Sequence, residues 1–544
     1  MKLINLCLVA LLLSINSAYA SGTEFSEPIE IVSGEGWNKV LQTSNGNTLL
    51  FHFQLRKALL VKVFDKSRKE IASEKFLGKV IEIGDMDLSE LHGIYEIGNE
   101  AVVFISQPVY NNNTLIALRF NTQTGKIIKE QTLLTSPNFK ARNTYSVIRN
   151  ISAGGYAVFC MKDLEANFEE KLRMVVFDDS HNKLKEVPVD INTKDYDFVE
   201  HVSTDAGSDG TYTVTLTCKK IIHYPDDIDR FFAVCHLPKE SNVFSTVLTK
   251  LPANVAPYFS MYTHNDFSNK LNLFVVNAQT QYYRHGLNTR SRIVYTPMLL
   301  MYQKQNIAGM SYKAINHLMA NKYLKDNTDS TRSIDPIPTR VYTNRYGLTT
   351  LISEENELNV IVKNAVTSHT MIGSIAVTLI DEAGNEVWSV VLPKKQFVRT
   401  PITIYDLYQR GTLAKLFRRY DASSDWIYQF LSYNSVMNTS GTCYIIHNDL
   451  HANKNKTIAE VADSMYSISN VNRFEKTNAI CYRITKKREG TKFDLFGTSS
   501  KDVSYAAMIE GSDYNEQTQT YSSVVLHRLA DKYVYRLAWR KLED

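Results

Sequence analysis

The feature that most constrains the fold of this chain is a short pattern that recurs at nearly constant spacing. An apolar run typical of a β-strand is followed by a polar turn rich in Asp, Asn, Gly and Lys, and then by another strand-like run. Clear copies of the apolar run end at Phe64, Phe120, Phe177, Cys235 and Ile380. When Phe64, Phe120, Phe177 and His236 are taken as equivalent, the steps between them are 56, 57 and 59 residues. A regular period of this size predicts a repeat architecture.

Weaker copies around Tyr302, Ile484 and His527 bring the number of units to about eight, each long enough for four strands. The hairpins resemble the outer strand pairs of β-propeller repeats of the PQQ-like and WD-like kinds, as in the segment from Ser374 to Leu392 with Gly384 and Trp388. There is no Trp-Asp dipeptide at the ends of the units and no repeated Gly-His. The resemblance therefore implies a fold and no particular activity.

The sequence predicts an all-β fold: a β-propeller of about seven or eight four-stranded blades with a few helical insertions. A tandem pair of β-sandwich domains is the alternative, because it would also show short strands and turn signals. The last unit contains only three strands, near Tyr505–Ile509, Ser522–Arg528 and Tyr533–Arg540, whereas an extra strand, Pro28–Val32, precedes the first unit. We expect this N-terminal strand to complete the last blade and so remove the exposed sheet edges.

The N-terminus reads as a secretory signal. Met1 and Lys2 precede an apolar run from Leu6 to Leu13, and Ala18-Tyr19-Ala20 forms a small-x-small cleavage site before Ser21. We expect residues 1–20 to be removed and residues 21–544 to form one propeller domain. No later stretch approaches the roughly 18 apolar residues of a membrane-spanning helix. The protein is therefore expected to be exported, to a periplasmic, cell-surface or secreted location, without a transmembrane segment in the mature chain.

Five cysteines follow the signal segment, with no C-x-x-C spacing that would suggest zinc or a redox motif. Cys218 and Cys235 flank an expected hairpin, and Cys443 and Cys481 could face each other across a longer one. Two disulfides are one interpretation for an oxidising compartment. Buried thiols that behave as small hydrophobic side chains are the alternative.

Three segments interrupt the repeat and are expected to be insertions, near residues 308–339, 401–420 and 448–478. The first contains an expected helix over Tyr312–Leu324, and the third contains one over Thr457–Met465. The second has apolar residues at roughly helical spacing, which Gly411 weakens. Insertions on a repeat scaffold tend to lie on its faces, where binding loops are found.

The charge pattern favours a local binding surface over a nucleic-acid partner. The chain has 61 basic against 57 acidic residues, a net charge of +4 that is too small for wholesale nucleic-acid binding. Between Lys394 and Arg419, however, seven basic residues face only Asp406. Basic groups interleaved with aromatic rings could bind an anionic protein or glycan partner. The candidate binding residues are Tyr405, Tyr408, Arg410, Lys415, Arg418 and Arg419.

A second cluster of the same character contains Tyr282, Tyr283, Arg284, His285, Arg290 and Arg292. For both clusters, a solvated face over core aromatic residues is the alternative interpretation.

Two groups of residues resemble metal ligands. In the first group, His447 and His451 lie four residues apart and would share one face of a helix, and Asp449 could add an oxygen ligand. The glutamate base of a zinc hydrolase is missing, and a polar loop with two solvated histidines is the alternative. The second group could give oxygen ligands to calcium and contains Asp190, Asn192, Asp195 and Asp197. Their spacing matches no calcium motif, and a solvated loop between blades is the alternative. Apart from calcium, no cofactor is expected.

The sequence contains no G-x-S-x-G elbow, no H-E-x-x-H helix, no G-x-x-x-x-G-K-[ST] phosphate loop and no EF-hand loop. The first hypothesis is therefore an exported, non-catalytic β-propeller that binds a protein or glycan partner through inserted loops. The alternative is a glycan- or peptide-cleaving hydrolase or lyase whose carboxylates come from different blades and meet at the central channel. A structural subunit of an envelope assembly is a third interpretation.

Overall fold

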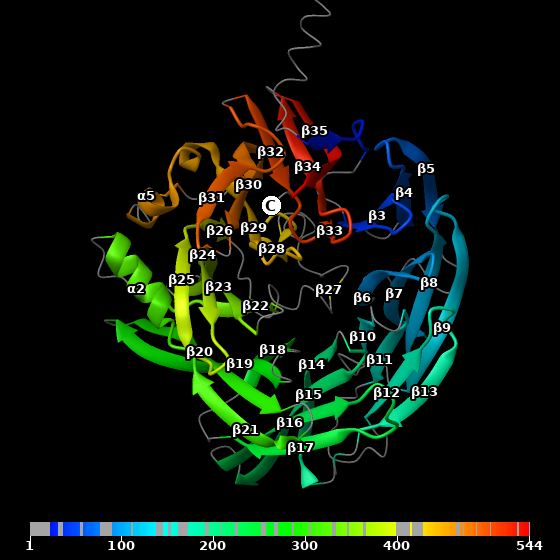
Figure 1. Cartoon of the computed structure of the whole chain (residues 1–544), viewed down its shortest axis with the longest axis vertical. Coiled ribbons are helices and arrows are strands. Elements are labelled where there is room, and N and C mark those ends of the chain that lie inside the picture. Colours follow the sequence, from blue (N-terminus) through cyan, green and yellow to red (C-terminus); the bar gives the residue numbers. More distant parts are fainter. Residues whose placement is uncertain are drawn as a thin grey trace, which may run out of the picture.

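The computed structural model describes residues 22–542 with internal gaps, and within them eight antiparallel sheets form a ring (Figure 1). The fold is an eight-bladed β-propeller, which confirms the first fold prediction and excludes the tandem β-sandwich. The gaps are residues 31–35, 55–57, 77–89, 110–111, 138–144, 151–153, 161–171, 190, 192–194, 208, 224–226, 252–256, 266–269, 286–287, 304–305, 329–332, 345–346, 363–365, 399–413, 416–427, 464–467, 470, 472, 486, 501 and 530–531.

The first four blades follow one another along the chain, and in each the first strand lies nearest the centre of the ring (Figure 1). Blade one contains β2 (Trp37–Gln42), β3 (Thr48–Gln54), β4 (Ala58–Phe64) and β5 (Glu70–Phe76). Blade two contains β6 (Glu90–Ile97), β7 (Glu100–Val109), β8 (Asn112–Asn121) and β9 (Ile127–Pro137). Blade three contains β10 (Tyr145–Arg149), β11 (Tyr156–Cys160), β12 (Arg173–Phe177) and β13 (Lys183–Pro188), and blade four contains β14 (Phe198–Ala206), β15 (Tyr212–His223), β16 (Asp227–Leu237) and β17 (Ser245–Lys250).

The other four blades carry the additions to the repeat. Blade five contains β18 (Pro257–Asn265), β19 (Lys270–His285), β20 (Asn288–Gln303) and β21 (Asn306–Ala314). Blade six contains β22 (Ile337–Thr343), β23 (Thr349–Val362), β24 (Val366–Ile380) and β25 (Glu386–Leu392), and β26 (Gln396–Val398) also pairs with β24. Blade seven contains β28 (Tyr433–Met437), β29 (Cys443–Leu450), β30 (Thr477–Ile484) and β31 (Gly490–Asp494), and blade eight contains β32 (Val503–Ala507), β33 (Asp513–Asn515), β34 (Thr520–Leu529) and β35 (Lys532–Lys541).

The N-terminal strand closes the ring, as expected, but it lies earlier in the chain than predicted. Strand β1 (Thr23–Phe25) pairs with β35 as the outermost strand of blade eight, whereas Ile29, in the predicted range, makes only an isolated bridge to Tyr535. Trp539 then joins this blade to blade one, because its Nε1 donates to Thr48 Oγ1 at 3.0 Å. The closure pairs the edge of β35, which would otherwise expose its backbone groups.

The repeat period has a local cause in the turn after the third strand of a blade. The Asp65 carboxylate accepts hydrogen bonds from the backbone N–H groups of Ser67 and Lys69, which closes the turn between β4 and β5. Asp178 and Asp381 repeat this arrangement in blades three and six. Such Asx turns explain why Asp or Asn starts the polar segment of so many units. One equivalence was wrong, since His527 lies in β34, which pairs directly with the inner strand β32 and is therefore second from the centre in its sheet.

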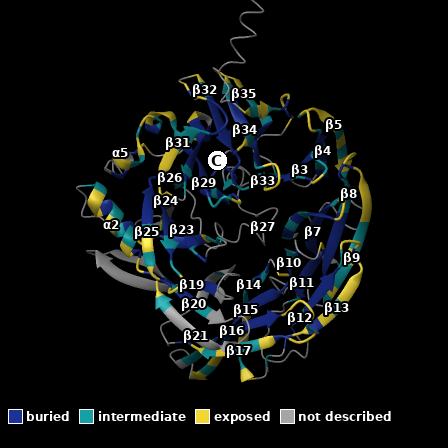
Figure 2. Ribbon diagram, in the orientation of Figure 1, coloured by how far each residue is buried: buried dark blue, intermediate teal, exposed yellow. Residues whose placement is uncertain are grey.

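Both faces of a blade are buried against its neighbours, so inner strands are apolar in continuous runs. Strand β3 is buried at six of its seven positions, whereas the outer strand β5 has no buried position. Figure 2 shows the same gradient from buried inner strands to exposed outer strands.

The insertions near 308–339 and 448–478 contain the expected helices, with shifted bounds. Helix α2 (Leu318–Asn327) begins later than predicted because Tyr312–Ala314 belong to β21 and three residues separate that strand from the helix. Helix α5 (Ile458–Asp463) starts with a capping box, in which Thr457 Oγ1 accepts from Glu460 N and Glu460 Oε2 accepts from Thr457 N. Two short 3-10 turns, η3 (His451–Asn453) and η4 (Phe474–Lys476), lie in the same region.

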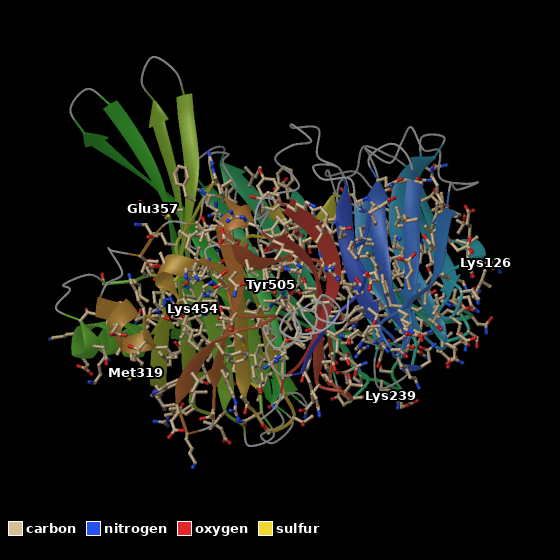
Figure 3. The ribbon with its side chains drawn as sticks, turned by 90° about the horizontal axis from the view of Figure 1, so that it is seen from above. Lys126, Lys239, Met319, Glu357, Lys454 and Tyr505 are labelled. Atoms are coloured by element: carbon tan, nitrogen blue, oxygen red, sulfur yellow. The ribbon has the colours of Figure 1, made fainter. Side chains whose placement is uncertain are left out.

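Blades five and six also carry two long hairpins, β19–β20 and β23–β24, which project side by side from one face of the ring (Figure 3). We call these hairpins the arms.

No disulfide links the five cysteines that follow the signal segment, all of which lie in the described part of the chain, so the interpretation as disulfides was wrong. Cys218, Cys235, Cys443 and Cys481 are buried thiols, as the alternative predicted. Burial raises the pKa of the Cys218 and Cys235 thiols to about 12. In the residues covered by the structure, no helix is long and apolar enough to span a membrane.

Candidate functional site

Most of the predicted basic surface lies outside the described residues. Of the six candidate binding residues, only Lys415 is described, in β27 (Ala414–Lys415), and the gaps contain Tyr405, Tyr408, Arg410, Arg418 and Arg419. Lys394, at the start of the basic segment, is described and is buried. Strand β27 pairs with β6 on the inner edge of blade two, with Lys415 opposite Glu90 (Figure 1). The second insertion therefore reaches the centre of the ring, and its binding role stays a prediction.

The second basic and aromatic cluster lies on the arm of blade five. Tyr283 in β19 pairs with Arg290 in β20, and Tyr282 pairs with Ser291. Because the cluster flanks the hairpin loop, it lies at the end of the arm that is farthest from the ring. Its binding role also stays a prediction.

The structure places the three predicted metal ligands in different environments rather than on a helix. His447 is fully buried in β29, and burial, reinforced by the Lys394 charge, lowers its pKa to about 3. Asp449, at the end of the same strand, accepts a hydrogen bond from Asn453 Nδ2 at 2.6 Å. The exposed ring of His451 lies 2.9 Å from Ser499 Oγ through its Nδ1. The alternative interpretation, a polar loop with two solvated histidines, is therefore wrong for His447. It agrees with the structure only in the exposure of His451.

The residues proposed for calcium are only partly described. Asp190 and Asn192 fall in gaps, Asp195 is exposed, and the Asp197 carboxylate accepts from Ile221 N at 2.6 Å. Among the side chains that the structure describes, no group of three or more His, Cys, Asp or Glu residues could hold a metal ion.

The structure brings together a different set of polar residues, which the sequence reasoning missed. They come from the inner strands of blades one, two, three, four and six and from the segment of blade eight that passes beside β2. We call them the axial cluster: Lys39, Tyr95, Arg149, Asp205, Arg340, Tyr342, Glu510 and Asp513.

Electrostatic interactions link members of the axial cluster on blades that are not neighbours in the ring. The Lys39 ammonium on blade one interacts with the Arg340 guanidinium on blade six. Arg149 on blade three interacts with Asp513 on blade eight. Because interactions between charges are screened over roughly 10 Å in physiological salt, the two charged groups of each pair lie within roughly that distance of each other.

Lys39 and Asp513 form the best-fixed part of the cluster. Lys39 Nζ donates to Ser512 O at 2.5 Å, and the Asp513 carboxylate accepts from Gln42 N at 2.7 Å. Burial lowers the pKa of Lys39, although the Asp513 and Glu510 charges oppose this shift. Burial likewise raises the pKa of Asp513, against the Lys39 charge. The segment 510–513 is thus held against β2.

Asp205 and Tyr95 form the second part. Burial raises the pKa of Asp205 to about 7, since only the backbone N–H of Ala206 favours its ionised form. Burial also raises the pKa of Tyr95 to about 12, with the Asp205 charge adding to the shift and the Arg149 charge opposing it. Near neutral pH, Asp205 can therefore accept or donate a proton.

The side chains of Arg149 and Arg340 form no ion pair or hydrogen bond at contact distance within the described residues. Arg149 is half-buried and Arg340 is exposed. Tyr342, two residues after Arg340, donates to Ser435 O at 2.8 Å and so is held between blades six and seven. Two available guanidinium groups beside two tyrosine rings can bind a carboxylate and pack against a sugar ring.

One signal in the sequence could have found part of this cluster. Lys39, Tyr95, Arg149 and Asp205 follow one another at steps of 56, 54 and 56 residues, which is the repeat period itself. Polar residues at equivalent positions of successive inner strands are expected to meet at the axis. The contribution of blade eight follows no period, because it comes from an irregular segment between β32 and β34.

Comparisons with known proteins give only weak similarities. No protein-family model and no curated protein sequence matches the chain. Among solved structures, a eukaryotic initiation factor matches with 8% identity and a TM-score of 0.37, over 97% of this chain and 96% of that one. An α-L-arabinanase from Penicillium chrysogenum matches with 11% identity and a TM-score of 0.32, over 62% and 93% of the two chains. A GH43 endo-arabinanase from Bacillus licheniformis matches with 10% identity and a TM-score of 0.25, over 52% and 98%. Similarities of this strength carry no argument about function.

Proposed function

We propose that this chain is an exported β-propeller that binds an acidic glycan at the centre of its ring. The observation that carries the proposal is the pair of guanidinium groups, Arg149 and Arg340, which lie in the axial cluster with no carboxylate at ion-pair distance among the described residues. An Arg side chain matches a carboxylate in a bidentate geometry, and a tyrosine ring can pack against a sugar ring. The predicted signal segment supports export.

The second insertion supports the same location for the ligand. Strand β27 places part of this segment on the inner edge of blade two, so an inserted loop and the axial cluster approach the same axis. The proposal therefore keeps the role of inserted loops that the sequence suggested.

The test measures binding of the mature protein to oligogalacturonides and to neutral galacto-oligosaccharides of the same length. We expect the acidic oligosaccharides to bind, and the double variant Arg149→Gln/Arg340→Gln to lose affinity at least about tenfold, equivalent to about 1.4 kcal/mol. Lys239→Gln, an exposed position on the turn after β16 (Figure 3), is the matched control and should bind normally. Equal affinity of the double variant and the native protein would rule out the axial site.

A second candidate function is cleavage of the bound glycan, which the raised pKa of Asp205 favours. A carboxyl group that is partly protonated near pH 7 can act as a general acid, and Asp513 would be a second carboxyl group at the axis. Release of reducing ends is measured in the same samples. Release that disappears in Asp205→Asn, with binding retained, would establish the enzyme, whereas binding without release would support the binding protein.

A further inference from the structure

A pocket lies at the periphery of the ring, between blades seven and eight. Its volume is about 720 Å³, within the range of small-molecule sites, which is roughly 300–1,000 Å³. Its wall is formed by β30 and β31, by the loop after η3 and by the end of β35. Lys454, labelled in Figure 3, lies on this wall. The pocket is therefore separate from the axial cluster.

The pocket is strongly basic. Its wall contains Lys454, Arg483, Lys492, Arg540 and Lys541, against one carboxylate, Asp494. This excess of basic residues comes from segments far apart in the sequence, so only the closed ring assembles it.

The local acidic groups are already engaged. Asp494 accepts from Asn478 Nδ2 at 2.7 Å and lies 2.8 Å from Lys454 Nζ. Lys492 Nζ donates to Asn453 O at 2.7 Å and lies 3.6 Å from Asp449, whose pKa is raised by burial. The carboxylates near the pocket thus pair with Lys454 and Lys492.

Arg483 differs from these lysines. Its Nε–H is buried and has no hydrogen-bond partner among the described residues. A buried donor that forms no hydrogen bond costs roughly 1–3 kcal/mol, more when the group is charged. The rest of the Arg483 side chain is only partly buried and lines the pocket, so its guanidinium adds to the positive charge that an anion entering the pocket would meet.

We propose that this pocket binds a small ligand through a tetrahedral oxyanion, a phosphate or sulfate group carried on a sugar-sized molecule. A tetrahedral oxyanion has enough acceptor oxygens to engage Arg483 together with neighbouring cations, and a planar fork of N–H donors matches its geometry. The volume leaves room for the sugar that carries the group. This site is independent of the acidic glycan proposed for the axis.

The test is calorimetric titration of the mature protein with glucose 6-phosphate, glucose 6-sulfate, inorganic phosphate and glucuronate. We expect at least one of the two esters to bind, and Arg483→Gln to weaken that binding at least about tenfold. Lys126→Gln, at an exposed position in the turn after β8 (Figure 3), is the matched control and should bind like the native protein. Lys541→Gln, an exposed position on the pocket wall, is the second variant if Arg483→Gln does not fold, and it should weaken binding in the same direction.

The four probes separate the alternatives. Tighter binding of an ester than of inorganic phosphate supports a sugar-borne group, and equal binding supports recognition of the oxyanion alone. Absence of binding by all three oxyanions, glucuronate binding as tight as that of the esters, or unchanged binding in Arg483→Gln would overturn the proposal. The outcome is independent of the axial site, since Arg149 and Arg340 are unchanged in these variants.

Discussion

The buried ion pair between Lys394 and Glu354 is predicted to contribute strongly to the stability of the ring. The two side chains are 1% and 0% exposed, and Lys394 Nζ lies 2.8 Å from Glu354 Oε1. Ser432 Oγ also donates to Glu354, at 2.8–2.9 Å from its two carboxylate oxygens. Glu354 lies at the bulge where β23 leaves the body of blade six to form its arm, and its hydrogen bond from Ser432, the residue before β28, joins the base of the arm to blade seven.

Lys394→Met removes the cation and leaves Glu354 buried without it. Breaking a fully buried ion pair in this way costs about 3–5 kcal/mol, because the remaining charge stays desolvated. With a urea dependence of about 3 kcal/mol per molar, the unfolding midpoint should fall by at least about 1 M. Replacing both partners, in Lys394→Met/Glu354→Leu, should recover most of this loss, since no unpaired charge remains.

The assay is urea unfolding followed by tryptophan fluorescence. The control is Lys322→Met, which removes an ion pair with Asp326 on α2, where the two side chains are 62% and 52% exposed. Because this pair is exposed, its loss should change the free energy of unfolding by less than about 0.5 kcal/mol. A loss below about 1 kcal/mol in Lys394→Met, or a double variant no more stable than the single one, would refute the reasoning.

Three further predictions concern the core, the closure of the ring and the axial segment. Burial lowers the pKa of His92 and His447 to about 3, below the ordinary histidine value near 6.5. Between these two pH values the unfolded chain binds more protons than the folded protein. The stability that is present above pH 6.5 is therefore lost as the pH falls toward 3. For each histidine ring, the free energy of unfolding changes by about 1.4 kcal/mol per pH unit. Urea unfolding between pH 7 and 5 should therefore show a shallower decline of this free energy in His92→Gln than in the native protein. An identical decline would contradict this account. Trp539→Ala should cost about 3–5 kcal/mol in the same assay, because the ring is 1% exposed and joins blades eight and one, and a cost under about 1 kcal/mol would show that the closure does not depend on it. Gly511→Ala would place a Cβ 2.3 Å from Asn38 O. We expect this clash to displace the segment 510–513 and to weaken binding of the oligogalacturonides. Normal affinity in this variant would count against the axial site.

The repeat made the architecture predictable. Period-2 strands, the Asx turns after Phe64 and Phe177 and a nearly constant step are local properties, and local hydrogen bonds fix them. The sequence also predicted that an N-terminal strand would close the ring, but β1 begins several residues before the predicted strand. The apolar run after Pro28 looked more strand-like, whereas pairing with β35 decides which residues close the sheet.

The candidate sites could be predicted only in part. Lys39, Tyr95, Arg149 and Asp205 recur at the repeat period, but polar residues on strands are common, and the period alone does not distinguish a residue at the axis from one at a blade edge. His447 and His451 show the opposite error. Their spacing resembles a ligand pair only on a helix, and the strand that contains His447 buries it in the core.

The sequence by itself therefore determined the repeat unit and the predominance of strands and limited the number of blades to about seven or eight, because these depend on interactions within about sixty residues. Only the tertiary structure decided which charges meet. Lys39 and Arg340 lie on blades one and six, and the pocket near Arg483 combines blade seven with the end of β35. Closing the ring brings residues hundreds of positions apart into contact, and no local pattern records a contact that depends on the angle and order of eight blades.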